Sequence, residues 1–343
     1  MLPTTPSIWF PTVRTGTGSD VFTQRLVENL CKRGVRAEIT WLPLRAEYAP
    51  LTVPIPRAPS WATVAHVNTW LHTRFLPRSL PIVATIHHAI HHKDACAYKD
   101  SLQAAYHRWW IAPNERRILR RAHQVVAVSR FVANSTRHSL LDIPMHTIYN
   151  GIDTEQFRPN KHQLSKHFRL LFVGSWKPLK GVDLLAPIMR KLGSNFLLHY
   201  TGGPLAKKDK AHMPPNMIDI GRLPIDKVIA VMQSADALLF PSRSEGFGLV
   251  AVEAMACGLP VIAARNASLS EVVADGKTGV LCQPDDVEAF VSAARSMATN
   301  TAQHTTLAQA GRLRALEQFS ETAMVDAYMH LYHSTQTNSN EAL

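Results

Sequence analysis

Residues 241–260 read Pro-Ser-Arg-Ser-Glu-Gly-Phe-Gly-Leu-Val-Ala-Val-Glu-Ala-Met-Ala-Cys-Gly-Leu-Pro, between two short apolar runs at 237–240 and 261–264. Apolar runs of this length are typical of buried parallel strands. Between them, apolar residues recur at helical spacing from Leu249 until Gly258 ends the pattern. The segment therefore predicts a strand, a helix and a second parallel strand, which is the repeating unit of α/β sheets.

The loop before this predicted helix has the chemistry of an anion site. Backbone N–H groups at Gly248 and Leu249 would open the helix, and a helix N-terminus favours a phosphate. Glu245 in the loop and Glu253 two turns along the helix can accept hydrogen bonds from hydroxyls. A phosphate site beside two such carboxylates predicts a nucleotide-sugar site. A glutamate pair without this context would more often lie on a solvated loop and helix face.

The same residues carry a family resemblance. Residues 245–253 resemble the Glu-x7-Glu signature of retaining glycosyltransferases with the GT-B fold, family four in the sugar-transferase classification, and the similarity continues through residues 271–279 and 284–285. The resemblance implies that Glu245 holds hydroxyls of the donor sugar and that Glu253 holds the ribose. It assigns sugar and phosphate oxygens to the backbone amides of Phe247, Gly248 and Leu249.

A second glycine turn, residues 174–181, resembles the family's Gly-Arg…Lys-Gly phosphate clamp. Lys180 occupies the lysine position, where it would neutralise the diphosphate. Ser175 stands where the family has arginine, so one hydroxyl replaces a charged bidentate group. Either Lys177 or Arg14 compensates, or donor affinity is weak. Further along, the resemblance places the turn that contains Leu223 near the nucleobase of the donor.

The first strand-to-helix turn of the chain contains Gly16 and Gly18, which would let the backbone approach a ligand closely. The GxGxxG spacing is not completed and no acid ends the second strand, which argues against a dehydrogenase. In the resembled family this loop faces the cleft. His87 ends a later strand in the pattern Thr-x-His, and the resemblance places it in the cleft near the donor sugar. A hydrogen-bonded structural histidine is the alternative.

The resemblance covers nearly the whole chain and implies a GT-B fold, in which two Rossmann-like parallel-sheet domains face each other across a cleft. Residues 1–158 would form the acceptor-side domain and residues 159–319 the nucleotide-sugar-binding domain. Residues 320–343 would form a C-terminal helix that crosses back to the N-terminal domain, with a loose polar tail. A length of 343 residues and 46% hydrophobic content agree with two α/β cores.

The net charge of +11 predicts attraction to polyanions. Between Tyr106 and Arg121 five arginines are clustered with two tryptophans, a pattern typical of membrane interfaces. A surface helix with Trp109 and Trp110 packed on the domain core is an equal alternative. Nucleic acid ranks lower, because no base-stacking or groove-reading motif accompanies the charge.

The remaining composition argues against metals and disulfides. Four cysteines far apart form no Cys-x-x-Cys pair and are expected as reduced thiols. The chain contains no Asp-x-Asp triplet, so a metal-bridged diphosphate lacks its usual carboxylates, and no cofactor is expected. A zinc site is the minority interpretation of the histidine cluster His87, His88, His91 and His92. Only Asp94 is a nearby carboxylate.

The expected location is cytoplasmic, since the chain shows neither a secretory signal nor an apolar stretch that could span a bilayer. Attachment to the inner face of the membrane would bring the segment from Tyr106 to Arg121 to an anionic surface.

The sequence and the resemblance together predict a retaining, metal-independent hexosyltransferase. It would move a sugar from a nucleotide-diphosphate sugar to a hydroxyl of a cell-envelope glycan or lipid-linked saccharide, as in lipopolysaccharide or exopolysaccharide synthesis. The predicted catalytic residues are His87, Lys180 and Glu245. The alternatives are a sugar-nucleotide epimerase or hydrolase of the same fold, and a non-catalytic membrane- or polyanion-binding protein.

Overall fold

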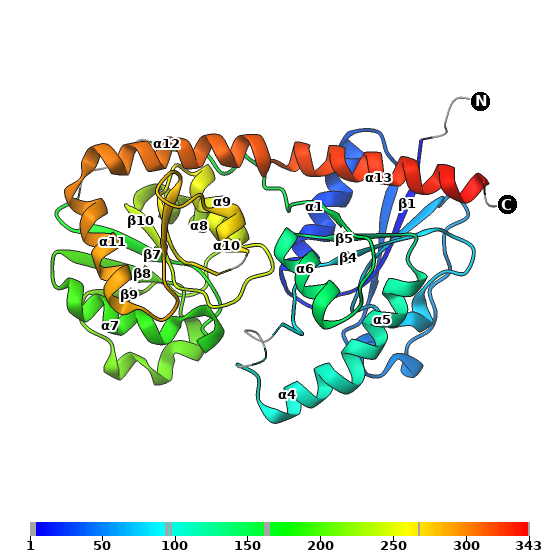
Figure 1. The fold of residues 1–343 in the computed structure, drawn as a ribbon, viewed down its shortest axis with the longest axis horizontal. Helices are drawn as coiled ribbons and strands as arrows, with labels where there is room; N and C mark the ends of the chain where they lie inside the picture. The colour runs from blue at the N-terminus through cyan, green and yellow to red at the C-terminus, as the bar shows by residue number, and fades with distance from the viewer. Residues whose placement is uncertain (1–4, 93–95, 97, 161–164, 267, 342–343) are drawn as a thin grey trace. The chain divides into compact units, whose positions relative to one another are not determined.

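The structure is a computed structural model that describes residues 5–92, 96, 98–160, 165–266 and 268–341. The chain divides into two compact units (Figure 1). Unit 1 comprises Met1–Gly151 and Glu321–Leu343, and unit 2 comprises Ile152–Ser320. Within the described ranges, none of the helices combines the length and the apolar character that a membrane span requires.

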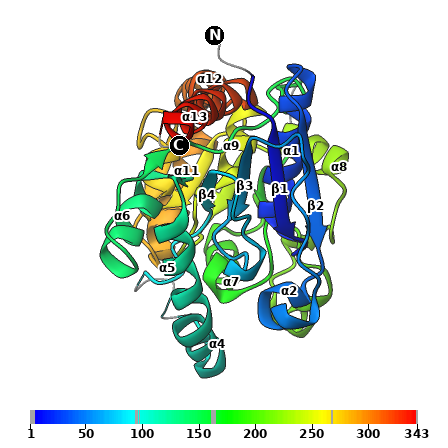
Figure 2. The same cartoon turned by 90° about the vertical axis from the view of Figure 1, so that its right-hand side faces the viewer.

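Unit 1 contains a six-stranded parallel sheet in the order β2-β1-β3-β4-β5-β6, and Figure 2 shows its first four strands in that order. The sheet has the flavodoxin-like 2-1-3-4-5 order, in which the direction of winding reverses between β1 and β3. Its elements are β1 (Ile8–Val13), α1 (Gly18–Lys32), β2 (Ala37–Leu42), α2 (Arg45–Tyr48), η1 (Pro50–Thr52), β3 (Val64–Asn68), η2 (Thr73–Phe75), β4 (Ile82–Ile86), α4 (Ser101–Tyr106), the π-helical η3 (His107–Ile111), α5 (Ala112–Arg121), β5 (Gln124–Ala127), α6 (Arg130–Ser139), β6 (His146–Thr147) and α13 (Glu321–Glu341).

Unit 2 contains a second six-stranded parallel sheet, in the order β12-β11-β10-β7-β8-β9. Counted along the chain this is the Rossmann order 3-2-1-4-5-6, which reverses between β7 and β10. Its elements are β7 (Phe168–Phe172), η4 (Pro178–Lys180), α7 (Val182–Leu192), β8 (Phe196–Tyr200), η5 (Gly203–Lys208), η6 (Lys210–His212), β9 (Met217–Asp219), α8 (Ile225–Ser234), β10 (Ala237–Phe240), α9 (Leu249–Ala256), β11 (Val261–Ala264), α10 (Leu269–Val272), β12 (Gly279–Cys282), α11 (Val287–Thr299) and α12 (Thr301–Gln318).

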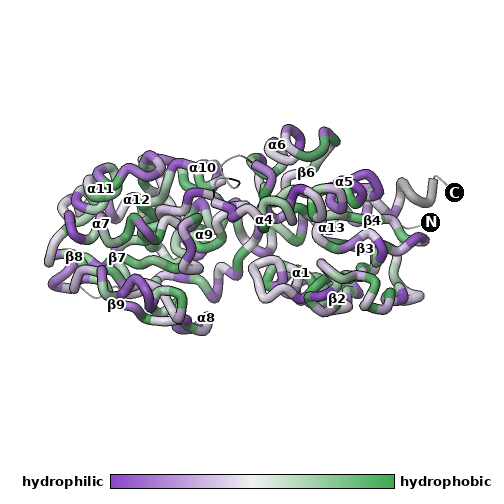
Figure 3. Tube along the Cα trace, turned by 90° about the horizontal axis from the view of Figure 1, so that it is seen from below, coloured by the Kyte–Doolittle hydropathy of each residue, from purple (hydrophilic) through white to green (hydrophobic). Residues whose placement is uncertain are grey.

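The apolar runs on either side of residues 241–260 are the strands β10 and β11, as predicted. Every residue of both strands is buried, because helices cover both faces of the sheet. Hydrophobic residues gather in the interior of each unit, while hydrophilic residues lie mostly on the outside (Figure 3). The predicted α/β fold of two parallel-sheet domains is confirmed.

The C-terminal helix α13 packs on unit 1, as predicted. Its Tyr332 hydroxyl lies 2.6 Å from Nδ1 of the buried His66, whose Nε2 lies 2.7 Å from the Thr85 hydroxyl. Thr85 also hydrogen-bonds Tyr328, at 3.1 Å. The prediction of a loose tail was wrong, because the helix continues to Glu341. Residues 333–341 contain no glycine or proline that would end it.

Candidate functional site

The candidate donor site lies in unit 2, where the strand order reverses. Open α/β sheets bind ligands at the carboxyl ends of their strands, at the point of reversal. Here the loop after β7 leads to Lys180 in η4, and the loop after β10 contains Glu245. The two predicted donor residues therefore come from the two loops that the sheet order selects.

Lys180 and Glu245 form an ion pair. The distance from Nζ of Lys180 to Oε1 of Glu245 is 2.6 Å, and the side chains are 23% and 11% exposed. An ion pair so largely withdrawn from water is screened much less by salt than a surface pair. A ligand phosphate could take the place of the carboxylate at Lys180, which would free Glu245 to accept hydrogen bonds from sugar hydroxyls.

Two glycines bring the loops of this site close together. Gly181 has φ +70°, and a Cβ there would lie 2.2 Å from the Pro241 carbonyl oxygen. Gly248 has φ +97°, and a Cβ would lie 2.5 Å from Cδ2 of Leu269. Both positions favour glycine for their conformation, and at Gly181 the neighbouring backbone also leaves no space for a side chain. Gly248 is also the N-cap of α9 and no side chain caps that helix, which leaves its N-terminus to favour an anion.

The other residues predicted to bind the donor are distributed around this pair. Ser175 is exposed in the turn before Lys180, and Glu253 is half-buried on α9. Phe247 is buried against Phe319, with ring centroids 5.4 Å apart, so only its backbone could serve a ligand. Leu249 begins α9, whereas Leu223 is partly buried beyond β9, two strands from β7.

Sequence reasoning missed residues that shape the loop after β10. Ser268 donates a hydrogen bond from its hydroxyl to the Glu245 carbonyl, at 2.8 Å. The guanidinium of Arg243 binds the carboxylates of Asp183 and Asp285. Arg243 lies inside the segment 241–260, but its partners Asp183 and Asp285 are 60 and 42 positions away in the sequence. Only the folded chain brings them together.

In unit 1 the strand order reverses between β1 and β3, next to the turn that contains Gly16 and Gly18. The Asp20 carboxylate fixes this turn by accepting hydrogen bonds from the N–H groups of Thr15, at 2.9 Å, and Gly16, at 2.7 Å. Gly16 has φ +70°. No described atom lies within 4 Å of a Cβ built at either glycine, so there is open space beside the turn.

His87 follows β4 and lies near the same point of reversal. Its Nε2 lies 2.9 Å from Oδ1 of Asn68, whose amide donates to the Thr12 hydroxyl at 3.0 Å. Burial lowers the pKa of His87 to about 4, so its imidazole is neutral at pH 7. If Nε2 donates to Asn68, Nδ1 carries the lone pair that could accept a hydrogen bond from a hydroxyl.

The histidine cluster after His87 has hydrogen-bonding partners in unit 1. Nε2 of His91 lies 2.8 Å from Oε2 of Glu115, and Thr69 donates to the other oxygen of that carboxylate, also at 2.8 Å. No group of three or more possible metal ligands occurs among the residues that the structure describes. Asp94, the nearby carboxylate in the zinc-site alternative, lies outside the described residues.

The basic and aromatic segment from Tyr106 to Arg121 forms η3 and α5. Trp109 is 73% exposed, so the alternative in which both tryptophans pack on the core does not hold for it. Trp110 is 39% exposed and donates from its indole to the Glu47 carbonyl, at 2.8 Å. Leu102, one helical turn before Tyr106, is 84% exposed. Large apolar side chains therefore face solvent beside exposed arginines on this part of unit 1.

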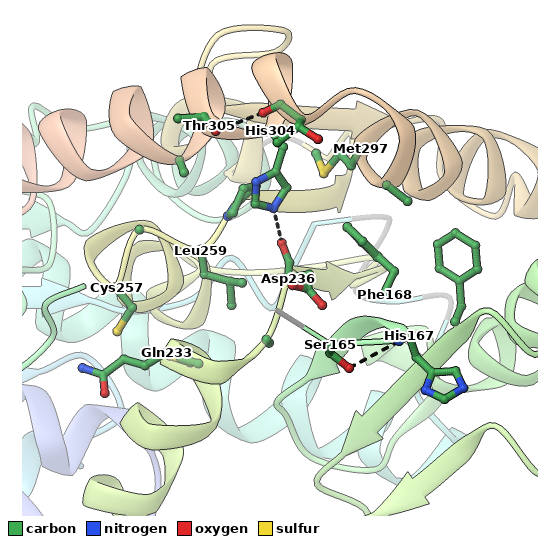
Figure 4. Close-up of a pocket in the computed structure, with 18 of the residues that line it drawn as sticks. Ser165, His167, Phe168, Gln233, Asp236, Cys257, Leu259, Met297, His304 and Thr305 are labelled. Carbon is green, nitrogen blue, oxygen red and sulfur yellow. Dashed lines mark hydrogen bonds between the residues drawn. The ribbon is translucent and has the colours of Figure 1, made fainter. Parts of the chain in front are cut away.

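A separate pocket of about 930 Å³ lies at the opposite edge of the unit 2 sheet, where the strands begin (Figure 4). Phe168, Asp236, Cys257 and His304 are among the residues that line it. Its polar groups bind one another: Nε2 of His304 lies 2.7 Å from the Asp236 carbonyl oxygen. Because ligands of such sheets bind at the other ends of the strands, this pocket is not part of the candidate donor site.

Two family models match the chain. Residues 153–314 match the family model of glycosyl transferases group 1, and residues 20–156 match that of glycosyltransferase family 4. The two matched regions together run from residue 20 to residue 314. Over most of its length the chain is therefore similar to glycosyltransferases of group 1 and of family 4.

Relatives of known sequence include other glycosyltransferases. An uncharacterised glycosyltransferase of Methanocaldococcus jannaschii is 33% identical over 218 residues, which are 61% of this chain and 57% of the relative, less than two thirds of its length. An MMP α-(1→4)-mannosyltransferase of Mycolicibacterium hassiacum is 28% identical over 288 residues, which are 75% of this chain and 67% of the relative.

Solved structures share the fold at low sequence identity. Sucrose-phosphate synthase of Thermosynechococcus elongatus superposes with a TM-score of 0.78 at 19% identity, covering 95% of this chain and 98% of that protein. HepE of Anabaena, in complex with UDP, gives a TM-score of 0.73 at 16% identity, covering 96% of this chain and all of that protein. These likenesses support the GT-B fold.

Proposed function

We propose that the protein is a retaining glycosyltransferase that moves a sugar from a nucleotide-diphosphate sugar to the hydroxyl of an acceptor substrate. The observation that carries the proposal is the ion pair of Lys180 with Glu245, beside the uncapped N-terminus of α9, at the reversal of the unit 2 sheet. This arrangement offers positive groups to a diphosphate and a carboxylate to a sugar. The UDP in the HepE complex is a ligand of the proposed kind.

In the proposed reaction the bond from the sugar's anomeric carbon to the diphosphate oxygen breaks, and a bond to the acceptor substrate's oxygen forms. The proton of the acceptor hydroxyl passes to the departing diphosphate. Negative charge develops on the leaving diphosphate. Lys180 and the first N–H groups of α9 are fixed before the reaction, so they stabilise that charge without reorganising. Glu245 holds sugar hydroxyls and thereby orients the anomeric carbon.

We propose that His87 acts with an uncharged imidazole. A histidine whose pKa is about 4 is uncharged at pH 7 and can accept a hydrogen bond from a hydroxyl without attracting the diphosphate. Asn68 fixes its ring orientation through the 2.9 Å contact. We propose that His87 binds a hydroxyl of one of the two substrates.

We propose that the reaction needs no metal ion. Lys180 supplies positive charge to the diphosphate, and Lys177 is exposed in the same turn. The N-terminus of α9 adds a partial positive charge. These groups do what a divalent cation does in metal-dependent glycosyltransferases.

The proposed acceptor substrate is a saccharide held at an anionic membrane, as in cell-envelope glycan synthesis. Trp109 and Leu102 are exposed, as are Arg117 and Arg120 on α5. Each arginine near an anionic surface contributes about 1 kcal/mol, so this segment supports reversible, salt-sensitive binding.

Co-sedimentation with anionic and neutral vesicles tests the membrane proposal. The variant changes Arg117 and Arg120 to Gln and Trp109 to Ala, and leaves Arg116, which donates to the Leu140 carbonyl at 2.9 Å, in place. Wild type should sediment with anionic vesicles only, and the variant should remain in solution. Equal behaviour of both proteins would refute the membrane proposal.

Incubation with nucleotide-diphosphate sugars, with and without saccharide acceptors, tests the proposed reaction. The proposal predicts an acceptor-dependent glycoside whose anomeric configuration matches that of the donor. An epimerised sugar nucleotide, or free sugar formed equally without acceptor, would identify an epimerase or a hydrolase instead. An inverted product would refute retention.

A further inference from the structure

Arg243 has an unusual set of contacts for a loop arginine. Its side chain is only 10% exposed. Both terminal nitrogens bind the carboxylate of Asp183, at 2.7 and 2.6 Å, and Nε binds Oδ1 of Asp285 at 2.6 Å. One terminal nitrogen also donates to the Pro178 carbonyl. Bidentate arginine–carboxylate contacts are strong and directional, so they fix the geometry of the residues they join.

These contacts join the two loops of the donor site. Arg243 lies two residues before Glu245, whereas Asp183 lies three residues after Lys180, in the first turn of α7. Pro178 belongs to the same 3-10 turn as Lys180. The backbone adds to the connection, because the N–H of Arg243 donates to the Leu179 carbonyl at 2.9 Å.

Asp285, which contacts Arg243, has a strained backbone conformation. It is the only non-glycine residue with a positive φ, 63°, among the described residues. Such a conformation is costly for a residue with a side chain and persists where the surroundings impose it. Asp285 belongs to the family-like segment of residues 284–285, and the donor chemistry proposed above gives it no task. Its contact with Arg243 supplies one.

The charges around Arg243 argue against a direct contact with a diphosphate. Burial acts to raise the pKa of Asp183, but the hydrogen bonds and charge of Arg243 outweigh it and hold that pKa below its usual value. Asp183 is therefore ionised at pH 7. Two carboxylates surround a single guanidinium, so the group as a whole is not positive and would not attract an anion.

We propose that Arg243 is a positioning residue of the donor site: through Asp183 and Asp285 it holds Lys180 and Glu245 at the separation that a nucleotide-diphosphate sugar requires. The inference rests on the proposed function, since it assigns a task at the same site. It gives Arg243 no contact with the substrate. Loss of the contact would let the two loops shift, and small displacements of binding groups weaken a site strongly.

Calorimetric titration tests the proposal. Wild type is first titrated with UDP, GDP and ADP, and the nucleotide that it binds most tightly is then used for the variants. Arg243→Gln and Asp183→Asn should each weaken that nucleotide about tenfold, within the range for neighbours in one hydrogen-bond network. Lys191→Gln is the matched control, because Lys191 lies on the same helix α7 and forms an exposed ion pair with Glu288. This control should bind like wild type.

A second titration distinguishes a positioning role of Arg243 from direct binding and from general destabilisation. If Arg243 acts through Lys180, then Arg243→Gln should change affinity less than about twofold in a Lys180→Ala background. A full tenfold effect in that background would mean direct binding or general destabilisation and would overturn the proposal. Thermal melting of each variant accompanies the titrations, and Asp183→Asn serves if Arg243→Gln does not fold.

The outcomes distinguish this inference from the proposed function. If wild type binds a nucleoside diphosphate and both Arg243→Gln and Asp183→Asn bind it equally well, only the positioning role is refuted. If wild type binds none of the three nucleotides, the donor site itself is refuted and the positioning role with it.

Discussion

Both units are built on a six-stranded parallel sheet, but they differ in chemistry at the point where the strand order reverses. In unit 2 that point holds the ion pair of Lys180 with Glu245 and the largely buried side chain of Arg243. In unit 1 it holds the neutral groups of His87, Asn68 and Thr12, joined by hydrogen bonds. The Asp20 carboxylate in the adjacent turn is occupied by backbone N–H groups. Charged groups suit a diphosphate leaving group, and neutral ones suit the hydroxyls of a saccharide. Under the proposed function, this difference would divide the substrates between the two units by charge.

Lys180→Ala should have the largest effect, because it removes the charge that stabilises the leaving diphosphate. Loss of one fixed donor to a developing anion costs about a hundredfold or more in kcat. His87→Ala, at the point where the strand order of unit 1 reverses, should lower kcat clearly less. Steady-state kinetics of both variants test this order, and a larger effect of His87→Ala would contradict the division by charge.

Glu245→Ala should reduce transfer next most strongly. Loss of a hydrogen bond to a charged group costs about 1.5–3 kcal/mol, which is roughly ten- to a hundredfold in rate. Thermal melting should show that the variant folds, because the side chain serves Lys180 and the ligand rather than the core. Wild-type turnover in a folded Glu245→Ala protein would remove Glu245 from the site.

The stability of unit 1 should depend on pH through His66. Burial, and then the nearby His87, lower the pKa of His66 to about 3, against about 6.5 in an unfolded chain. Between these values the unfolded state binds more protons, so stability falls as pH falls. At pH 5 the loss is about 2 kcal/mol. Denaturant unfolding at pH 7.5 and 5.0 should show a smaller loss for His66→Gln. An equal loss would mean that His66 is not neutral in the native state.

Ser175→Arg should strengthen the attraction of the unit 2 site for a diphosphate. A guanidinium in this exposed turn could contact the diphosphate in a bidentate manner, which should tighten nucleoside diphosphate binding about tenfold at low salt. The gain should shrink as salt is added. Unchanged affinity at low ionic strength would show that Lys177 or another base already fills this position.

Removal of metal ions should have the smallest effect. If Lys180 and the N-terminus of α9 supply the charge, turnover in excess EDTA should equal turnover without it. Restoration of lost activity by added Mn²⁺ would show that a metal ion is required.

Local patterns predicted the two α/β units, whereas the donor-site residues were taken from the family resemblance and stay predictions. The strands β10 and β11 and the glycine before α9 are encoded by residues next to one another, and so is the Glu245 loop. Features that depend on distant partners were not predictable. Nothing near Arg243 indicates Asp183 or Asp285, and helical periodicity alone did not decide whether Trp109 faces the core or solvent.

Titration of wild type and Glu245→Ala with a nucleotide sugar and with its nucleoside diphosphate examines the two roles assigned to the ion pair. Glu245 should bind the sugar and, without donor, compete with phosphate for Lys180. Glu245→Ala should therefore bind the nucleotide sugar more weakly and the nucleoside diphosphate as tightly as wild type or more tightly. Equal weakening of both ligands, or no binding of either by wild type, would contradict this account of the donor site.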